Sequence, residues 1–158
     1  MKQSSTLFLK GVVSLIGIGV LVGLIWFPQL EGRNANADLA TIYLKDWFLA
    51  YIYVASIPFF IALYQAFKLL GFIEQIKAFS QTSVATLRNI KYCAIAIIGF
   101  IIGAEVFIIL SSEEDSAGFL ALGMYTAFIS IVVATFAAVL QKLIQNAVDL
   151  KSENDLTV

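Results

Sequence analysis

The sequence predicts an all-α integral membrane protein built as a four-helix bundle, and three observations carry this prediction. Hydrophobic residues make up 60% of the 158-residue chain and charged residues only 13%, with a mean hydropathy of +0.90. A soluble domain of this length cannot bury so much apolar surface within itself. The apolar residues are gathered in four long runs separated by polar segments, and each run reaches the roughly 20 residues that a helix needs to cross a bilayer.

The four predicted transmembrane helices cover about 8–30, 45–67, 90–112 and 116–141. The first run follows Lys2 and Lys10 as a signal peptide would. Its uncharged stretch is longer than the roughly 7–15 residues of a signal core, so we expect it to be retained as a membrane helix. The fourth run is long enough to tilt or to project beyond the bilayer.

The distribution of Lys and Arg predicts that both termini face the cytoplasm. Eight of the ten positive residues fall in the N-terminal segment, in 68–91 and after 141, which lie on one side of a four-helix protein. The other side has only Arg33 and Lys45. The positive-inside rule then places both termini and the 68–91 segment on the cytoplasmic side of the plasma membrane.

The segment 68–91 is predicted to form a cytoplasmic helical loop. In 68–80 the apolar residues recur every three or four positions, as in an amphipathic helix that continues the second span or lies along the interface. The sequence "SQTS" (80–83) offers hydroxyl groups that can cap the next helix.

The C-terminal helix and tail, 142–158, keep a helical rhythm that we expect to fray near Lys151. Both cytoplasmic segments could simply pack against the bundle and the lipid headgroups, which the pattern alone favours. The sharper hypothesis is a docking surface for a cytoplasmic partner, formed by Phe79, Ser80, Arg88, Lys91, Glu153, Asp155 and Leu156.

A single carboxylate interrupts the third span, where "IIGAEVFIIL" (101–110) contains Glu105. An ionised carboxylate facing lipid costs about 2.5–3.5 kcal/mol on insertion scales. We therefore expect Glu105 to face the bundle or a wet crevice, or to stay protonated. Its candidate partners, chosen at a similar depth on the other helices, are Tyr53, Tyr125 and Thr126, with Lys45 at the outer rim.

Two interpretations of Glu105 are equally compatible with the sequence: a structural hydrogen bond and a proton- or ligand-sensing site. Gly99 and Gly103 form a G-x-x-x-G pair on the same helix. Such a pair allows a second helix to approach closely.

No catalytic or cofactor-binding apparatus is recognisable. Histidine is absent, and Cys93 is the single cysteine, which excludes an intramolecular disulfide and a cysteine metal cluster. A net charge of −1 provides no basic field for nucleic acid, and no phosphate-binding, dinucleotide-binding or nucleophile motif is present. We expect a non-enzymatic protein without cofactor or metal, whose first partner is the lipid bilayer. A homo-oligomer is compatible with so small a bundle.

Two segments resemble a bacterial membrane family, domain-of-unknown-function family 2975. They are "AFSQTSVATLRNIKYCA" (78–94), which runs into the third span, and "NAVDLKSENDLTV" (146–158), which follows the fourth. The resemblance implies a multi-pass protein of the bacterial inner membrane with no established enzyme activity. It also implies partnership with a small helix-turn-helix transcription regulator encoded alongside.

The leading functional hypothesis is therefore a regulatory or sensory membrane protein whose cytoplasmic surface, 68–91 and 141–158, engages such a regulator. One alternative is a small transporter or channel subunit that uses Glu105 inside an oligomer. Another is a packing or envelope-stress protein that has no ligand.

Overall fold

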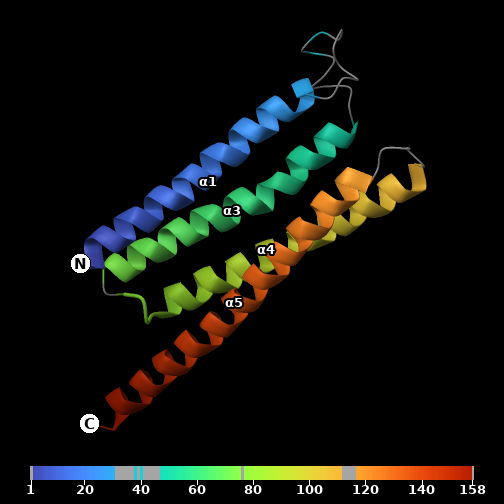
Figure 1. Cartoon of the computed structure of the whole chain (residues 1–158). Helices are drawn as coiled ribbons and strands as arrows, with labels where there is room; N and C mark the ends of the chain where they lie inside the picture. The colour runs from blue at the N-terminus through green and yellow to red at the C-terminus, as the bar shows by residue number, and fades with distance from the viewer. Residues whose placement is uncertain are drawn as a thin grey trace.

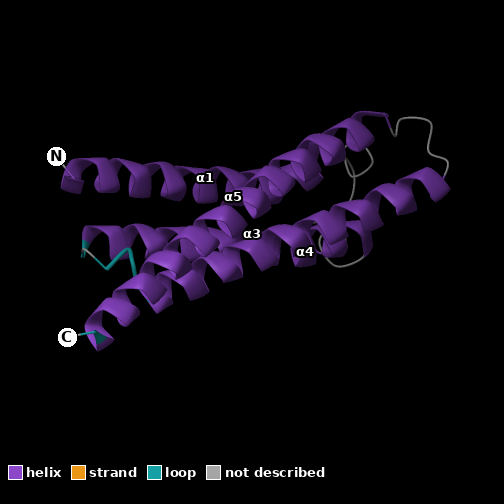
Figure 2. Ribbon diagram, turned by 90° about the horizontal axis from the view of Figure 1, so that it is seen from below, coloured by secondary structure: helices purple, strands orange, loops and turns teal. Residues whose placement is uncertain are grey.

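The computed structural model describes residues 2–30, 38, 40, 47–75, 77–111 and 117–157. They form four long helices, α1 (Lys2–Leu30), α3 (Trp47–Glu74), α4 (Gln81–Ser111) and α5 (Ala117–Leu156). Figure 2 shows no strand in the described part of the chain. All four helices are long and apolar enough to cross a membrane, which confirms the all-α, four-span prediction.

The helices pack side by side in chain order (Figure 1). The contact between α4 and α5 is the most extensive, that between α3 and α4 is smaller, and that between α1 and α3 is smaller still. No other pair of these four helices makes a comparable contact through its described residues. Both termini and the connection from α3 to α4 lie at one end, called the terminal end here, and the opposite end is called the far end.

The residues of α5 that face α4 recur at alternating spacings of three and four. They are Leu120, Gly123, Ala127, Ser130, Ala134, Ala137, Gln141, Ile144 and Val148, all buried or half-buried. This average period of 3.5 residues is that of a left-handed coiled coil. The five from Gly123 to Ala137 are Gly, Ala or Ser, so the α4 backbone can approach closely, which accounts for the extensive contact. The row and the α4 residues against it are called the α4–α5 seam.

The best-packed part of the molecule lies toward the terminal end, where α3, α4 and α5 meet. Its core comprises Leu87 and Ile90 of α4 and Ala137 of α5, with Ala66, Leu69 and Ile144 packed against it. Ser83 and Val84 at the start of α4 are almost fully buried as well. This cluster holds three of the four helices together.

The connection between α3 and α4 is shorter and less helical than predicted. The expected amphipathic helix continues α3, but only as far as Glu74, and 77–80 are not helical. The Ser83 N–H donates to Ser80 Oγ at 3.3 Å, which confirms the predicted cap at the start of α4. At the C-terminus of the chain, α5 stays helical to Leu156. The prediction that this helix frays near Lys151 is therefore wrong.

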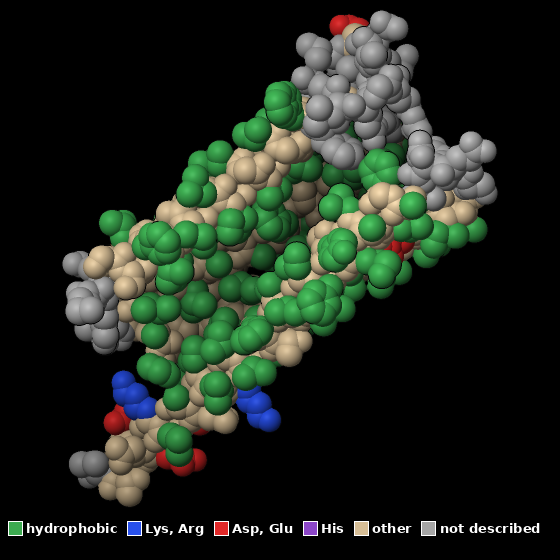
Figure 3. Space-filling model, viewed as in Figure 1, with side chains coloured by type: hydrophobic (Ala, Val, Ile, Leu, Met, Phe, Trp, Pro, Cys, Tyr) green, Lys and Arg blue, Asp and Glu red, His purple; other side chains and the backbone are tan. Residues whose placement is uncertain are grey.

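Apolar side chains cover most of the surface, while charged ones gather at the terminal end of α5 (Figure 3). Helix α5 has 40 residues and is therefore about 60 Å long, roughly twice the hydrocarbon thickness of a bilayer. Its charged residues all lie from Lys142 onward. The part of α5 that leaves the hydrocarbon is therefore its terminal end.

Candidate functional site

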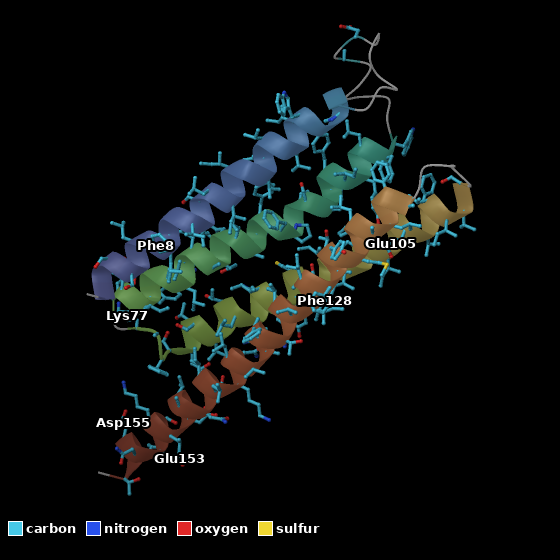
Figure 4. The ribbon with its side chains drawn as sticks, in the orientation of Figure 1. Phe8, Lys77, Glu105, Phe128, Glu153 and Asp155 are labelled. Carbon is cyan, nitrogen blue, oxygen red and sulfur yellow. The ribbon has the colours of Figure 1, made fainter. Side chains whose placement is uncertain are left out.

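Glu105 lies on the face of α4 that packs against α5, toward the far end of the seam (Figure 4). Its immediate neighbour on α5 is Gly123. A Cβ atom placed on Gly123 would lie 2.5 Å from Oε1 of Glu105 and 3.2 Å from its carboxyl carbon. The glycine therefore leaves the space that the carboxyl group occupies.

The Oε1 atom of Glu105 is buried and has no hydrogen-bond partner among the described residues. An unsatisfied buried polar atom costs about 1–3 kcal/mol, and more when it is charged. Because the described part of the seam offers Oε1 no donor, a proton, cation or polar group that reached this oxygen would gain a free acceptor.

None of the predicted partners that the structure describes donates a hydrogen bond to Oε1 of Glu105. The Tyr53 hydroxyl donates to the Leu24 carbonyl of α1 at 3.1 Å. Tyr125 is 71% exposed and faces outward, and Thr126 donates to Leu122 O of its own helix at 2.8 Å. Lys45 lies outside the described residues. A common depth in the bilayer sets the level of a residue but leaves open the side of the helix on which it lies.

Gly99 and Gly103 are predicted to let a second helix approach closely, but only Gly103 has a close neighbour on another helix. A Cβ atom on Gly99 would meet nothing within 4 Å, whereas one on Gly103 would lie 2.7 Å from the Tyr51 hydroxyl. That hydroxyl donates to Phe100 O at 2.6 Å. Gly103 therefore accommodates an aromatic side chain of α3, and Gly123 is the glycine that sequence reasoning missed. Its place in the three-four row of small residues on α5 was the available signal.

An apolar hollow of about 280 Å³ lies beside this region, between α3 and α4. It is lined by Trp47, Phe48, Tyr51, Gly103, Ala104 and Phe107. The rings of Phe48 and Phe107 stack with centroids 6.4 Å apart. Glu105 points to α5 and is not part of this lining, and no group of three metal-ligating side chains occurs among the residues described. The hollow is therefore lined mainly by aromatic and small residues, and its Tyr51 hydroxyl already donates to Phe100 O.

The predicted docking residues of 78–94 have divided roles. Phe79 and Arg88 are exposed, with Phe79 at 68%. Ser80 instead caps α4, and the Lys91 ammonium lies 5.0 Å from the centre of the Tyr92 ring. Of the four docking residues predicted in this segment, only Phe79 and Arg88 are exposed.

The predicted docking residues of the C-terminal segment all lie on the last turns of α5. Glu153, Asp155 and Leu156 are exposed, and Figure 4 shows the first two at the terminal end. The alternating spacing that puts Gln141, Ile144 and Val148 against α4 continues to Lys151 and Asp155, both of which are exposed. Helix α4 begins at Gln81, and the part of α5 that extends beyond this point toward the C-terminus is exposed.

The fold and the seam define a class, a multi-pass α-helical membrane protein with an unsatisfied carboxyl group between two helices. Within that class, the chain belongs to the family described as "Protein of unknown function (DUF2975)", whose model matches residues 31–158. It is 47% identical, over 160 aligned residues and the full length of both chains, to "Uncharacterized membrane protein YoaS" of Bacillus subtilis (strain 168). No solved structure matches the chain. The family prediction is confirmed.

Proposed function

We propose that this protein is a non-enzymatic regulatory or sensory membrane protein that binds a small helix-turn-helix transcription regulator at its terminal end. In this proposal the terminal end faces the cytoplasm, because it carries eight of the ten positive residues. Binding would hold the regulator at the membrane and lower its concentration on DNA.

The observation that carries the proposal is the uncovered face at the end of α5. Lys151 and Asp155 continue the α4-facing row beyond the first residue of α4, and both are exposed. A helix face that extends past its intramolecular partner offers a ready place for a helix of another protein. Helix-turn-helix regulators are themselves made of short helices.

The charge of this projection supports the same kind of partner. From 149 onward α5 carries Asp149, Glu153 and Asp155 against Lys151 alone. DNA-binding proteins carry basic surfaces that contact phosphate groups. An acidic helix attracts such a surface and competes with DNA for it.

The family-like segment 78–94 supports the proposal in a different way. Its buried residues, such as Val84 and Leu87, secure α4 against the base of α5. The projection therefore stands on the most closely packed part of the protein, and a partner bound to it would be held at a defined position.

The test is an affinity purification of the full chain from native membranes in mild detergent, followed by mass spectrometry. We expect a small helix-turn-helix protein to be recovered with the full chain. It should be lost from a chain truncated after Asp149 and from the neutralised variant Glu153→Gln/Asp155→Asn. A control variant, Gln81→Lys/Asn146→Lys, changes the charge by the same amount elsewhere at the terminal end and should retain it. Equal recovery with all four chains, or none with the full chain, contradicts the proposal.

A small transporter or channel subunit is a second candidate, favoured by the unsatisfied Oε1 atom of Glu105. This function requires that Glu105→Gln stop proton or cation flux in proteoliposomes while regulator recovery is unchanged, because the carboxylate is the group that would carry the ion. If the variant only shifts the melting temperature and flux is the same, Glu105 has a structural role.

A further inference from the structure

Helix α5 carries a second row of residues at heptad spacing, about 100° round the helix from the row that faces α4. The row, called the outer stripe here, contains Ile129, Val133, Phe136, Leu140, Leu143, Ala147, Leu150 and Asn154. Its spacing alternates between four and three residues throughout. The positions seven apart are all well exposed, at 61% for Ile129, 66% for Phe136, 58% for Leu143 and 67% for Leu150.

The outer stripe continues out of the hydrocarbon. Before Lys142 the exposed surface of α5 is almost entirely apolar, as expected inside the hydrocarbon. After Lys142 the exposed positions are mostly polar or charged, yet Leu143 and Leu150 keep the heptad spacing. Fully burying a leucine side chain is worth about 1.5–3 kcal/mol, so two exposed leucines in line on a projecting helix gain much from being covered.

We infer that a second copy of this chain covers the outer stripe, with the two α5 helices packed in parallel about a two-fold axis along the membrane normal. The bilayer gives all copies the same orientation, so a two-fold axis along its normal brings each stripe residue against its own counterpart. A spacing of 3.5 residues keeps two such helices in contact along their length. From 129 to 154 the contact extends for about 39 Å at 1.5 Å per residue.

The composition of the stripe suits contact between identical helices. None of its residues is charged, so self-association brings no like charges together. Leu143 and Leu150 occupy one set of heptad positions, and Asn154 occupies the alternate set. A single asparagine at such a position specifies register and the two-stranded state in parallel coiled coils. The leucines of the stripe therefore favour association of two helices, and Asn154 favours one register and a two-stranded state.

The pairing does not depend on the proposed function. Asp155 belongs to the α4-facing row of α5, about 100° round the helix from the outer stripe. A pair of chains would therefore present two docking faces with the same two-fold symmetry that dimeric helix-turn-helix regulators have.

The first test is cysteine cross-linking of the full chain in native membranes. In a Cys93→Ser background, single cysteines replace Leu143 or Leu150 on the stripe, and Asp149 or Ser152 off the stripe as exposed controls. After mild oxidation we expect about tenfold more covalent dimer from the two stripe positions than from the controls, equivalent to ~1.4 kcal/mol. Equal yields at all four positions, or no dimer at the stripe positions, overturn the inference.

The second test is the molar mass of the purified protein in mild detergent by light scattering. The natural chain should have the mass of a dimer and Leu143→Glu/Leu150→Glu that of a monomer. Gln145→Glu/Ser152→Glu has the same seven-residue spacing away from the stripe and should remain dimeric. Circular dichroism verifies that each variant is helical.

A monomeric natural chain, or a stripe variant that stays dimeric, overturns the inference. A different protein found on the stripe of a monomeric chain does so as well. The neutralised variant Glu153→Gln/Asp155→Asn should lose the regulator and keep the dimer mass, which separates failure of the pairing from failure of the proposed function.

Discussion

The two halves of the α4–α5 seam differ in what fills them. Toward the terminal end the seam is closed and largely apolar, with Leu87 and Ala94 of α4 each 3% exposed, although Oε1 of Gln141 is also buried there without a hydrogen-bond partner among the described residues. Toward the far end the same heptad row brings a carboxyl group, Glu105, against Gly123 and leaves one of its oxygens without a partner. One helix pair thus combines a stabilising core with a polar site that costs stability.

The third helix explains part of the difference. At the terminal end α3 contributes Ala66 and Leu69 to the core. At the far end an apolar hollow of about 280 Å³ lies between α3 and α4. Regions with fewer buried apolar contacts open at lower free-energy cost. We therefore expect stability to be concentrated at the terminal end and conformational adjustment at the far end.

The largest effect should come from breaking the closed half. Leu87→Ala removes a fully buried side chain from the point where three helices meet, and we expect it to lower the free energy of unfolding by about 2–4 kcal/mol. Denaturant unfolding in detergent micelles, followed by circular dichroism, measures this loss. Leu110→Ala is the matched control, because Leu110 is 77% exposed. If the two variants lose the same stability, the terminal half is not the core of the protein.

A smaller effect should come from filling the polar half. Gly123→Ala places a methyl group in the space of the Glu105 carboxyl, and we expect the unfolding free energy to fall by about 1–3 kcal/mol, as in overpacked cores. In Glu105→Ala the same substitution should cost much less, because the obstructing group is gone. A double-mutant cycle measures this coupling.

Gly19→Ala serves as the control for the glycine substitution, since a Cβ atom there meets nothing within 4 Å. It should leave stability unchanged or raise it slightly, because alanine favours helix more than glycine does. Additive effects of Gly123→Ala and Glu105→Ala would show that the two residues are not energetically coupled.

The smallest effect tests the boundary of the closed half. Ser80→Ala removes the hydroxyl that accepts the Ser83 N–H at the start of α4, which should cost about 1 kcal/mol. Ser152→Ala removes a hydroxyl that donates to Asp149 O on the exposed end of α5. That control should change stability by less than ~0.5 kcal/mol. Thermal unfolding of both variants in the same detergent measures the two changes. If Ser80→Ala does not lower the stability, the cap does not contribute to the start of α4.

The elements that were predictable are those whose signal adds up along the chain. The four apolar runs located the spans, and "SQTS" located the cap of α4. The end of α5 was not predictable in the same way. The apolar rhythm stops at Leu150, but the helix continues to Leu156, because backbone hydrogen bonds along a helix do not require an apolar face.

The sequence by itself determined that this chain is an α-helical membrane protein with four spans, one intramembrane acid and a charged end, because hydropathy and charge are local properties of each segment. Only the tertiary structure decided that Glu105 meets Gly123, while Tyr53 bonds to α1 and Tyr125 faces outward. These outcomes depend on how each helix is rotated about its own axis. In a helix that is apolar on every side, that rotation is set by the small residues its neighbour can pack against, and the helix's own hydropathy does not specify it.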